Sequence, residues 1–251
     1  MKAAIVIRSA LFALAQILIT PPYAVLALCT FPFAPLTRYR IIKGWAVIML
    51  ALLKNLCGIH YRVRGAAHIP GQPCIVMSKH QSAWETIAFQ AIFPPQVHVL
   101  KRELLWIPFF GWGLAMVSPI AIDRSAGSRA LKQMIEQGTD RLARGFCVIV
   151  FPEGTRVAPG SRGRYRPGGA IVAKETGVPI IPVAHNAGLC WPRNAFLKRP
   201  GTITVSVGPP ITAATPEAAM REVEQWIEAE MLEMDAVRPD EERGLRIQES
   251  E

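Results

Sequence analysis

The sequence lacks cysteine pairs at the close spacing that zinc sites and redox motifs require. The cysteines are odd in number, and each lies in an apolar run: Cys29, Cys57, Cys74, Cys147 and Cys190. A free cysteine in such a run behaves as a small hydrophobic side chain. The pattern argues against a disulfide framework or a zinc site and predicts a reducing compartment.

Charge is missing from Ser9 to Thr37, a run of 29 positions. A run this long and apolar is sufficient for a membrane-spanning helix. Pro21 and Pro22 lie in its middle and predict a break in the helix. A second apolar stretch, Trp45–Leu53, is too short to span. Two interpretations therefore stay open, a single span or a helical hairpin lying in one leaflet. No small-residue cleavage site ends the run, which argues against a signal peptide.

Acidic side chains are scarce outside the C-terminal segment. Residues 217–251 hold twelve of the nineteen acidic groups and four of the 28 basic ones, so this segment carries −8 and residues 1–216 carry +17. A basic body favours anionic partners, such as phosphorylated substrates, anionic membrane lipids or an acidic carrier protein. The basic residues are not interleaved with aromatic ones in a binding motif, so nucleic acid is not an expected partner.

Short apolar runs alternate with helical patterns after the N-terminal segment. Strands are predicted at Cys74–Ser78, Val97–Leu100, Phe146–Phe151, Val178–Ala184 and Thr202–Val207, and helices at Ala83–Phe93, Ser128–Arg144, Ile171–Glu175 and from Pro216, with Thr215 as N-cap. This alternation predicts an α/β fold with a mixed, partly parallel sheet flanked by helices, preceded by an N-terminal membrane-associated helical segment. We expect that segment at 1–58, the α/β domain at 59–235 and a flexible acidic tail at 236–251.

The first polar cluster follows the strand predicted at Cys74–Ser78 and contains His80 and Glu85. An imidazole suits proton removal from an alcohol near neutral pH, and a carboxylate at its other nitrogen would fix its tautomer. On one continuous helix, five residues turn through roughly 500°, which leaves the two side chains on different faces. They can meet only if His80 lies on the turn before the helix. Otherwise they are a surface pair.

The second cluster is Glu153-Gly154-Thr155-Arg156, directly after the apolar run Phe146–Phe151. Gly154 permits close backbone approach, Thr155 can donate a hydrogen bond, and a guanidinium such as that of Arg156 suits bidentate phosphate binding. The alternative interpretation is an ordinary polar exit from a strand. Because ligand sites gather at the carboxyl ends of strands in open α/β sheets, both clusters are candidate site residues.

Four blocks of the chain, in order, resemble the glycerolipid acyltransferase family typified by 1-acylglycerol-3-phosphate acyltransferases, in their bacterial form. The blocks are His80 to Glu85 (the H-x4-D block), Ile120 to Arg124 (preceded by Lys101 and Pro108), Phe151 to Arg156, and Val178 to Val183. The resemblance covers most of residues 60–210. Two departures stand out: the family's Asp is Glu85 here, and in the second block Ser118 and Ala121 replace a glycine and an aromatic residue.

The resemblance implies direct acyl transfer from acyl-CoA or acyl-carrier protein to the sn-2 hydroxyl of a lysophospholipid, without an acyl-enzyme, a metal or a bound cofactor. His80 would be the general base and Glu85 would orient it. Lys101, Arg124 and Arg156 would hold the acceptor's phosphate, and Glu153, Gly154 and Thr155 would shape its pocket. The expected product is phosphatidic acid, and the expected location is the cytoplasmic face of the inner membrane.

Two other functions remain open. One is a relative in the same family with another acceptor, such as a lyso-ornithine lipid. The other is a non-catalytic basic protein that binds anionic membranes. The four remaining histidines, His60, His68, His98 and His185, have no acid at useful spacing and are predicted to have core or surface roles.

Overall fold

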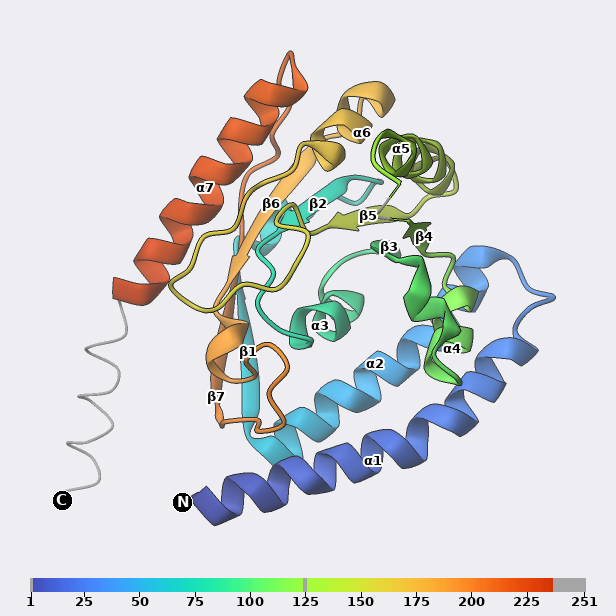
Figure 1. Cartoon of the computed structure of the whole chain (residues 1–251), viewed down its shortest axis with the longest axis vertical. Helices are drawn as coiled ribbons and strands as arrows, with labels where there is room; N and C mark the ends of the chain where they lie inside the picture. Colours follow the sequence, from blue (N-terminus) through green and yellow to red (C-terminus); the bar gives the residue numbers. More distant parts are fainter. Residues whose placement is uncertain (1, 124–125, 237–251) are drawn as a thin grey trace.

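The computed structural model describes residues 2–123 and 126–236 (Figure 1). Two N-terminal helices come first, and strands alternating with helices follow. The helices are α1 (Lys2–Cys29), α2 (Pro35–Cys57), α3 (Trp84–Ile92), α4 (Phe110–Met116), α5 (Ser128–Ala143), α6 (Gly168–Thr176) and α7 (Pro216–Ala236), with short 3₁₀ turns η1 (Ala66–His68), η2 (Arg102–Trp106) and η3 (Ala187–Leu189). The strands are β1 (Ile59–Arg64), β2 (Ile75–Ser78), β3 (Gln96–Lys101), β4 (Ile120–Ile122), β5 (Cys147–Val150), β6 (Ile180–His185) and β7 (Gly201–Val207).

The strands form one seven-stranded sheet in the order β1-β7-β6-β2-β5-β3-β4. Of its neighbouring pairs, β6–β7 is antiparallel and the others are parallel. The predicted α/β class with a mixed, partly parallel sheet is therefore confirmed. The central strands β2, β5, β3 and β6 run the same way, so their carboxyl ends share one edge of the sheet.

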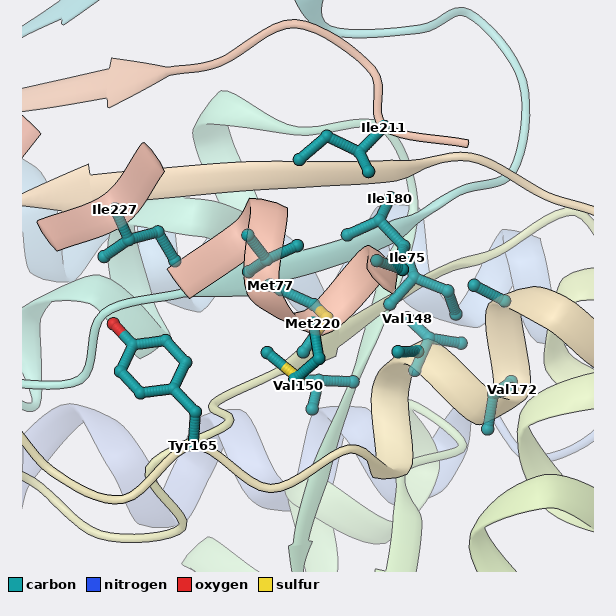
Figure 2. Close-up of a cluster of buried hydrophobic side chains, with 14 of the residues drawn as sticks. Ile75, Met77, Val148, Val150, Tyr165, Val172, Ile180, Ile211, Met220 and Ile227 are labelled. Carbon is teal, nitrogen blue, oxygen red and sulfur yellow. The ribbon is translucent and has the colours of Figure 1, made fainter. Parts of the chain in front are cut away.

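Hydrophobic side chains fill both faces of the sheet because successive residues of a strand point to opposite sides. Ile75 and Met77 of β2 belong to a cluster with Val172 of α6 and Ile227 of α7 (Figure 2). Val76 of β2 belongs instead to a second cluster, which contains residues of α1, α2 and α3. The sheet is thus covered by α5, α6 and α7 on one face and by the N-terminal helices and α3 on the other.

Helix α1 continues through Pro21 and Pro22, so the predicted break in the middle of the apolar run is wrong. A proline removes a helical N–H and normally weakens a helix there. Side-chain bonds to α2 support this stretch: the Tyr23 hydroxyl donates to the Ile41 carbonyl at 2.9 Å, and Trp45 Nε1 donates to Thr20 Oγ1 at 3.2 Å. Packing against α2 thus holds the helix together where its own backbone bonds are missing.

The outer side of α1 is strongly apolar. Its exposed side chains include Leu14, Ile17, Leu18, Val25 and Leu26. Within the described part of the chain, α1 is the helix that is long and apolar enough to cross a membrane. These features make the N-terminal part a segment for membrane association. The tail predicted from residue 236 lies outside the described residues from position 237 onward.

Two predicted helix ends agree with local chemistry. The N–H of Ala218 donates to Thr215 Oγ1 at 3.2 Å, which is the bond expected of an N-cap residue at the start of α7. Helix α6 ends before Gly177, whose φ of +71° is readily available to glycine. Strand β6 begins at Ile180, later than predicted, since Pro179 cannot donate to the ladder.

Candidate active site

His80 lies on the loop between β2 and α3, at the carboxyl edge of the sheet. Strand β2 ends at Ser78 and α3 begins at Trp84, so His80 precedes the helix that carries Glu85. The His80 Nδ1 atom is 2.8 Å from Glu85 Oε1. The condition set by the sequence, a histidine on the turn before the helix, is met. The Nδ1–H group donates a hydrogen bond to the carboxylate, which leaves the lone pair of Nε2 free to accept a proton.

Glu85 is fully buried and is held by the first turn of α3. Its Oε1 also accepts the backbone N–H groups of Gln81 at 2.9 Å and Ser82 at 2.8 Å. Burial acts to raise the pKa of this carboxyl, but the charges of His185 and His80 and these hydrogen bonds hold the pKa below its usual value. A buried carboxylate that stays ionised can keep the imidazole in one orientation and stabilise it when it gains a proton.

Two further histidines lie close to His80. His185, at the end of β6, donates from Nε2 to the Lys79 carbonyl at 2.8 Å, and this nitrogen is 3.9 Å from Glu85 Oε1. Burial lowers the pKa of His185 and lowers that of His98, on β3, to about 4. His185 is buried, in agreement with the predicted core role, but the position of both histidines beside the candidate base was not predicted.

Phe151 forms the floor under His80. The two rings are stacked with centroids 3.9 Å apart and planes 14° apart, and the His98 ring lies 6.0 Å from Phe151. Phe151 follows β5, the strand next to β2, so the sheet register places the ring below the imidazole. Together with the bond to Glu85, this stacking leaves the His80 ring little rotational freedom.

Glu153 is turned into the protein. Its carboxylate accepts from Lys79 Nζ at 2.9 Å, the His80 backbone N–H at 3.2 Å and the Gly163 N–H at 3.0 Å. Lys79 also contacts Glu228 of α7 at 2.8 Å. Glu153 therefore braces the loop that carries His80, a position that differs from the predicted place in the acceptor pocket. Neither Lys79 nor Glu228 was predicted, because each lies far along the chain from its partner.

A cavity of about 580 Å³ opens in front of His80, of the size that holds a small-molecule ligand. It is bounded by α1, α2, α3, α4 and the loops after β3 and β5. Five predicted site residues line it: His80, Lys101, Gly154, Thr155 and Arg156. Arg124, the remaining predicted phosphate ligand, lies outside the described residues.

The cavity wall combines cationic and apolar side chains. Lys43 and Arg193 join Lys101 and Arg156 on it, and no described acidic side chain lines it. Arg193 also donates to the Arg156 carbonyl at 2.9 Å, which ties the two segments together. Sequence reasoning missed Lys43 and Arg193, since neither lies in a recognisable block. Apolar residues such as Leu104, Phe110 and Val117 line the rest, so the cavity suits a ligand with an anionic head and an apolar chain.

An α/β sheet that presents a histidine, its buried carboxylate and a basic, apolar-walled cavity is typical of a class of enzymes that activate a hydroxyl by general-base catalysis. The comparisons with known proteins agree with this class. A family model described as "Acyltransferase" matches residues 60–186, and the chain belongs to this acyltransferase family.

Two curated relatives show the extent of the similarity. A 1-acyl-sn-glycerol-3-phosphate acyltransferase of Pseudomonas aeruginosa is 42% identical over 242 residues, which cover 92% of this chain and 93% of the relative. The human 1-acyl-sn-glycerol-3-phosphate acyltransferase alpha is 34% identical over 181 residues, which cover 69% of this chain and 63% of the relative. The similarity to the bacterial relative thus extends well beyond residues 60–186, which the family model matches.

A solved structure confirms the fold. The crystal structure of the 1-acyl-sn-glycerophosphate acyltransferase PlsC from Thermotoga maritima superposes with a TM-score of 0.74, at 21% sequence identity, and covers 92% of this chain and 95% of that one. Membership of the acyltransferase family makes the protein an acyltransferase, and the structural match confirms its fold.

Proposed function

We propose that the enzyme transfers a fatty acyl group from acyl-CoA or acyl-carrier protein to the sn-2 hydroxyl of 1-acyl-glycerol-3-phosphate, giving phosphatidic acid. The observation that carries this proposal is the 2.8 Å contact of His80 Nδ1 with Glu85 at the wall of a cavity lined by four cationic side chains. The names of the relatives support the same acceptor.

In the proposed reaction, His80 Nε2 takes the proton of the acceptor hydroxyl as its oxygen attacks the thioester carbonyl carbon. The carbon–sulfur bond then breaks, and the imidazolium returns the proton to the leaving thiolate. Glu85 stabilises the imidazolium while it exists. Lys101 and Arg156, joined by Lys43 and Arg193, bind the acceptor's phosphate. The donor is a co-substrate, and the scheme uses no metal or bound cofactor.

We place the enzyme at the cytoplasmic face of the inner membrane. The apolar outer side of α1 supports immersion in lipid, and the basic body supports contact with anionic headgroups. The same positive charge favours both donors, because acyl-CoA and acyl-carrier protein are acidic. The acceptor is itself a membrane lipid, so a membrane-bound enzyme meets it at its source.

The altered second block is compatible with this acceptor. Ser118, which replaces the family's glycine, has φ +58°, in the left-handed region that favours glycine, so the backbone shape is kept. Ala121 is bonded through both its N–H and its carbonyl to the side chain of Gln137 on α5. The substitutions therefore leave this segment fixed against α5.

The test is acyl transfer from oleoyl-CoA to lysophosphatidate by detergent-solubilised wild type, His80→Ala and His60→Ala. We expect His80→Ala to lose roughly a hundredfold or more in rate, as for removal of a general base. His60 is an exposed residue of β1, so its replacement should leave the rate unchanged. Acyl-carrier protein as donor and lyso-ornithine lipid as acceptor run in parallel.

Each arm of the experiment decides a separate point. Consumption of lyso-ornithine lipid alone would retain the acyltransferase and overturn the acceptor. Equal rates for His80→Ala and wild type would overturn the role of His80. Inactivity of the wild type with both donors would favour the non-catalytic membrane-binding function, which the family membership argues against.

A further inference from the structure

Three apolar side chains near η2 and α4 point away from the cavity and into solvent. Trp106 is 69% exposed, Ile107 43% and Trp112 41%. Their neighbours Leu104, Phe109 and Phe110 line the cavity, whereas these three do not. We refer to Trp106, Ile107 and Trp112 as the aromatic patch. Exposure of two indole rings and an isoleucine together costs free energy in water and marks an interaction surface.

The aromatic patch continues the apolar side of α1. Helix α4 packs on the C-terminal half of α1 so closely that a Cβ at Gly113 would lie 3.8 Å from the Ala24 Cα and 4.0 Å from the Ala27 Cβ (Figure 1). The exposed residues Val25 and Leu26 of α1 lie between these two alanines in the chain. Whatever medium covers this part of α1 therefore also reaches α4.

The charge distribution identifies that medium. Residues 1–122 carry eleven basic side chains and two acidic ones, and one of the two, Glu85, is buried. The acidic residues concentrate on α7, which packs on the opposite face of the sheet from α2 and α3. An apolar surface within a basic half of the molecule fits an anionic phospholipid bilayer, which attracts nearby basic residues.

We propose that the aromatic patch is a second membrane contact, with Trp106 and Trp112 at the headgroup level of an anionic bilayer that also holds α1. Tryptophan favours this zone because its ring is apolar and its N–H remains in a polar layer. With α1 as its only membrane contact, the protein would be free to rotate about the axis of α1. A second contact at the aromatic patch prevents this rotation and fixes the orientation of the protein on the bilayer. Phe109 and Phe110, which lie between Ile107 and Trp112 in the chain, line the cavity and are partly exposed, so a patch held at the bilayer brings this cavity wall to the lipid surface.

The proposal rests on membrane association of α1 and does not depend on the acyl acceptor. To test it, single cysteines are placed at Trp106, Trp112, Ile17 or Leu232 in a Cys29→Ser background and labelled with an environment-sensitive fluorophore. The native Cys29 is exposed and the other four cysteines are buried, so labelling is confined to the new site. The labelled proteins are reconstituted into vesicles of phosphatidylglycerol and phosphatidylethanolamine, with and without lipid that carries a nitroxide quencher near the headgroup.

Ile17 is 67% exposed on α1 and reports on immersion of the anchor, while Leu232, 73% exposed on α7, is the matched control on the opposite face. We expect labels at positions 106 and 112 to be quenched by roughly half, because they lie at the headgroup level. The label at 232 should remain unquenched. Quenching at 17 with none at 106 and 112 would overturn the patch and retain the anchor. If the label at 17 is neither quenched nor shifted in emission when the protein is placed in vesicles, both the patch and the anchor are overturned.

Discussion

At the scale of single residues, the acid–base pair is defined by local geometry. Glu85 has one more methylene than the aspartate of the family pattern, yet its Oε1 reaches His80 Nδ1 at 2.8 Å and two backbone N–H groups as well. Oε1 of Glu85 accepts all three hydrogen bonds, from the His80 imidazole and the two backbone N–H groups, so this one oxygen is enough to orient the imidazole.

His98 gives a prediction on stability against pH. Its folded-state pKa lies near 4 against an ordinary value of 6.5, because burial opposes its charge. The unfolded chain therefore binds the proton first, and stability is lost as pH falls from about 6.5 toward about 4. His98→Phe removes this loss, which amounts to as much as about 3 kcal/mol. Unfolding followed by fluorescence at pH 7 and pH 4.5 measures it.

The matched control for this experiment is His60→Phe on β1. It should retain the wild-type pH dependence, since His60 is exposed. If the free energy of unfolding changed equally with pH for wild type and His98→Phe between pH 6.5 and 4.5, a neutral His98 in the folded protein would be contradicted.

Sequence reasoning succeeded at this scale where partners are neighbours in the chain. His80 and Glu85 could be paired because a turn followed by a helix start brings positions five apart together. His185 could not be found in this way, since it reaches Lys79 across 106 positions through the pairing of β2 with β6. The hydrophobic periodicity of a sequence does not reveal the order of strands in the sheet, so contacts that depend on strand order were not predicted.

At the scale of elements, the sequence patterns predicted strands β2, β3, β5, β6 and β7 and helices α3, α5, α6 and α7. They did not predict the short elements β4 and α4 or the continuity of α1 through its prolines. Pro21 and Pro22 predicted a break in the helix. The hydrogen bonds of Tyr23 and Trp45 across the α1–α2 contact could not be predicted from the sequence, because they depend on how the two helices pack. A helix with missing backbone bonds can persist when a partner helix compensates. Tertiary packing therefore overrode the local preference of proline.

Gly44 tests this compensation. A Cβ at Gly44 would collide with the Tyr23 hydroxyl, so Gly44→Leu must displace the ring and loosen α1 from α2. Overpacking of this kind costs about 1–3 kcal/mol, and we expect the melting temperature in detergent to fall by roughly 5 °C. Gly71→Ala, at a position with no atom near the added methyl group, should leave it unchanged. Equal melting temperatures would show that Tyr23 does not brace the helix pair.

At the scale of the whole molecule, Lys79 connects the active-site loop to the last helix. The buried ammonium contacts Glu153 after β5 and Glu228 of α7, and the Tyr165 hydroxyl donates to the same Glu228 oxygen at 2.7 Å. Four segments that are distant in sequence thus meet one residue away from His80, the proposed general base. A displacement of α7 would therefore change the position of His80, because Glu228, Lys79 and Glu153 connect the two.

Replacement of Lys79 tests the connection. Lys79→Met leaves the buried carboxylate of Glu153 without a counter-charge, which typically costs about 3–5 kcal/mol, so the melting temperature should fall by roughly 10 °C and the rate of acyl transfer should fall with it. Lys54→Met, an exposed position on α2, is the control. Adding Glu153→Gln to Lys79→Met removes one uncompensated charge and should recover part of the stability. No recovery would contradict the charge-based explanation.

The place of β1 at the edge of the sheet has a consequence for biosynthesis. Its neighbour is β7, and Ile59 pairs with Gly201, a residue made 142 positions later. At ribosomal speeds of about 5–20 residues per second, β1 waits roughly 7–30 seconds for its partner strand. Helices α1 and α2 emerge first, so the nascent chain can reach the lipid before its sheet is able to close. The enzyme would then complete its folding already seated on the surface where it works.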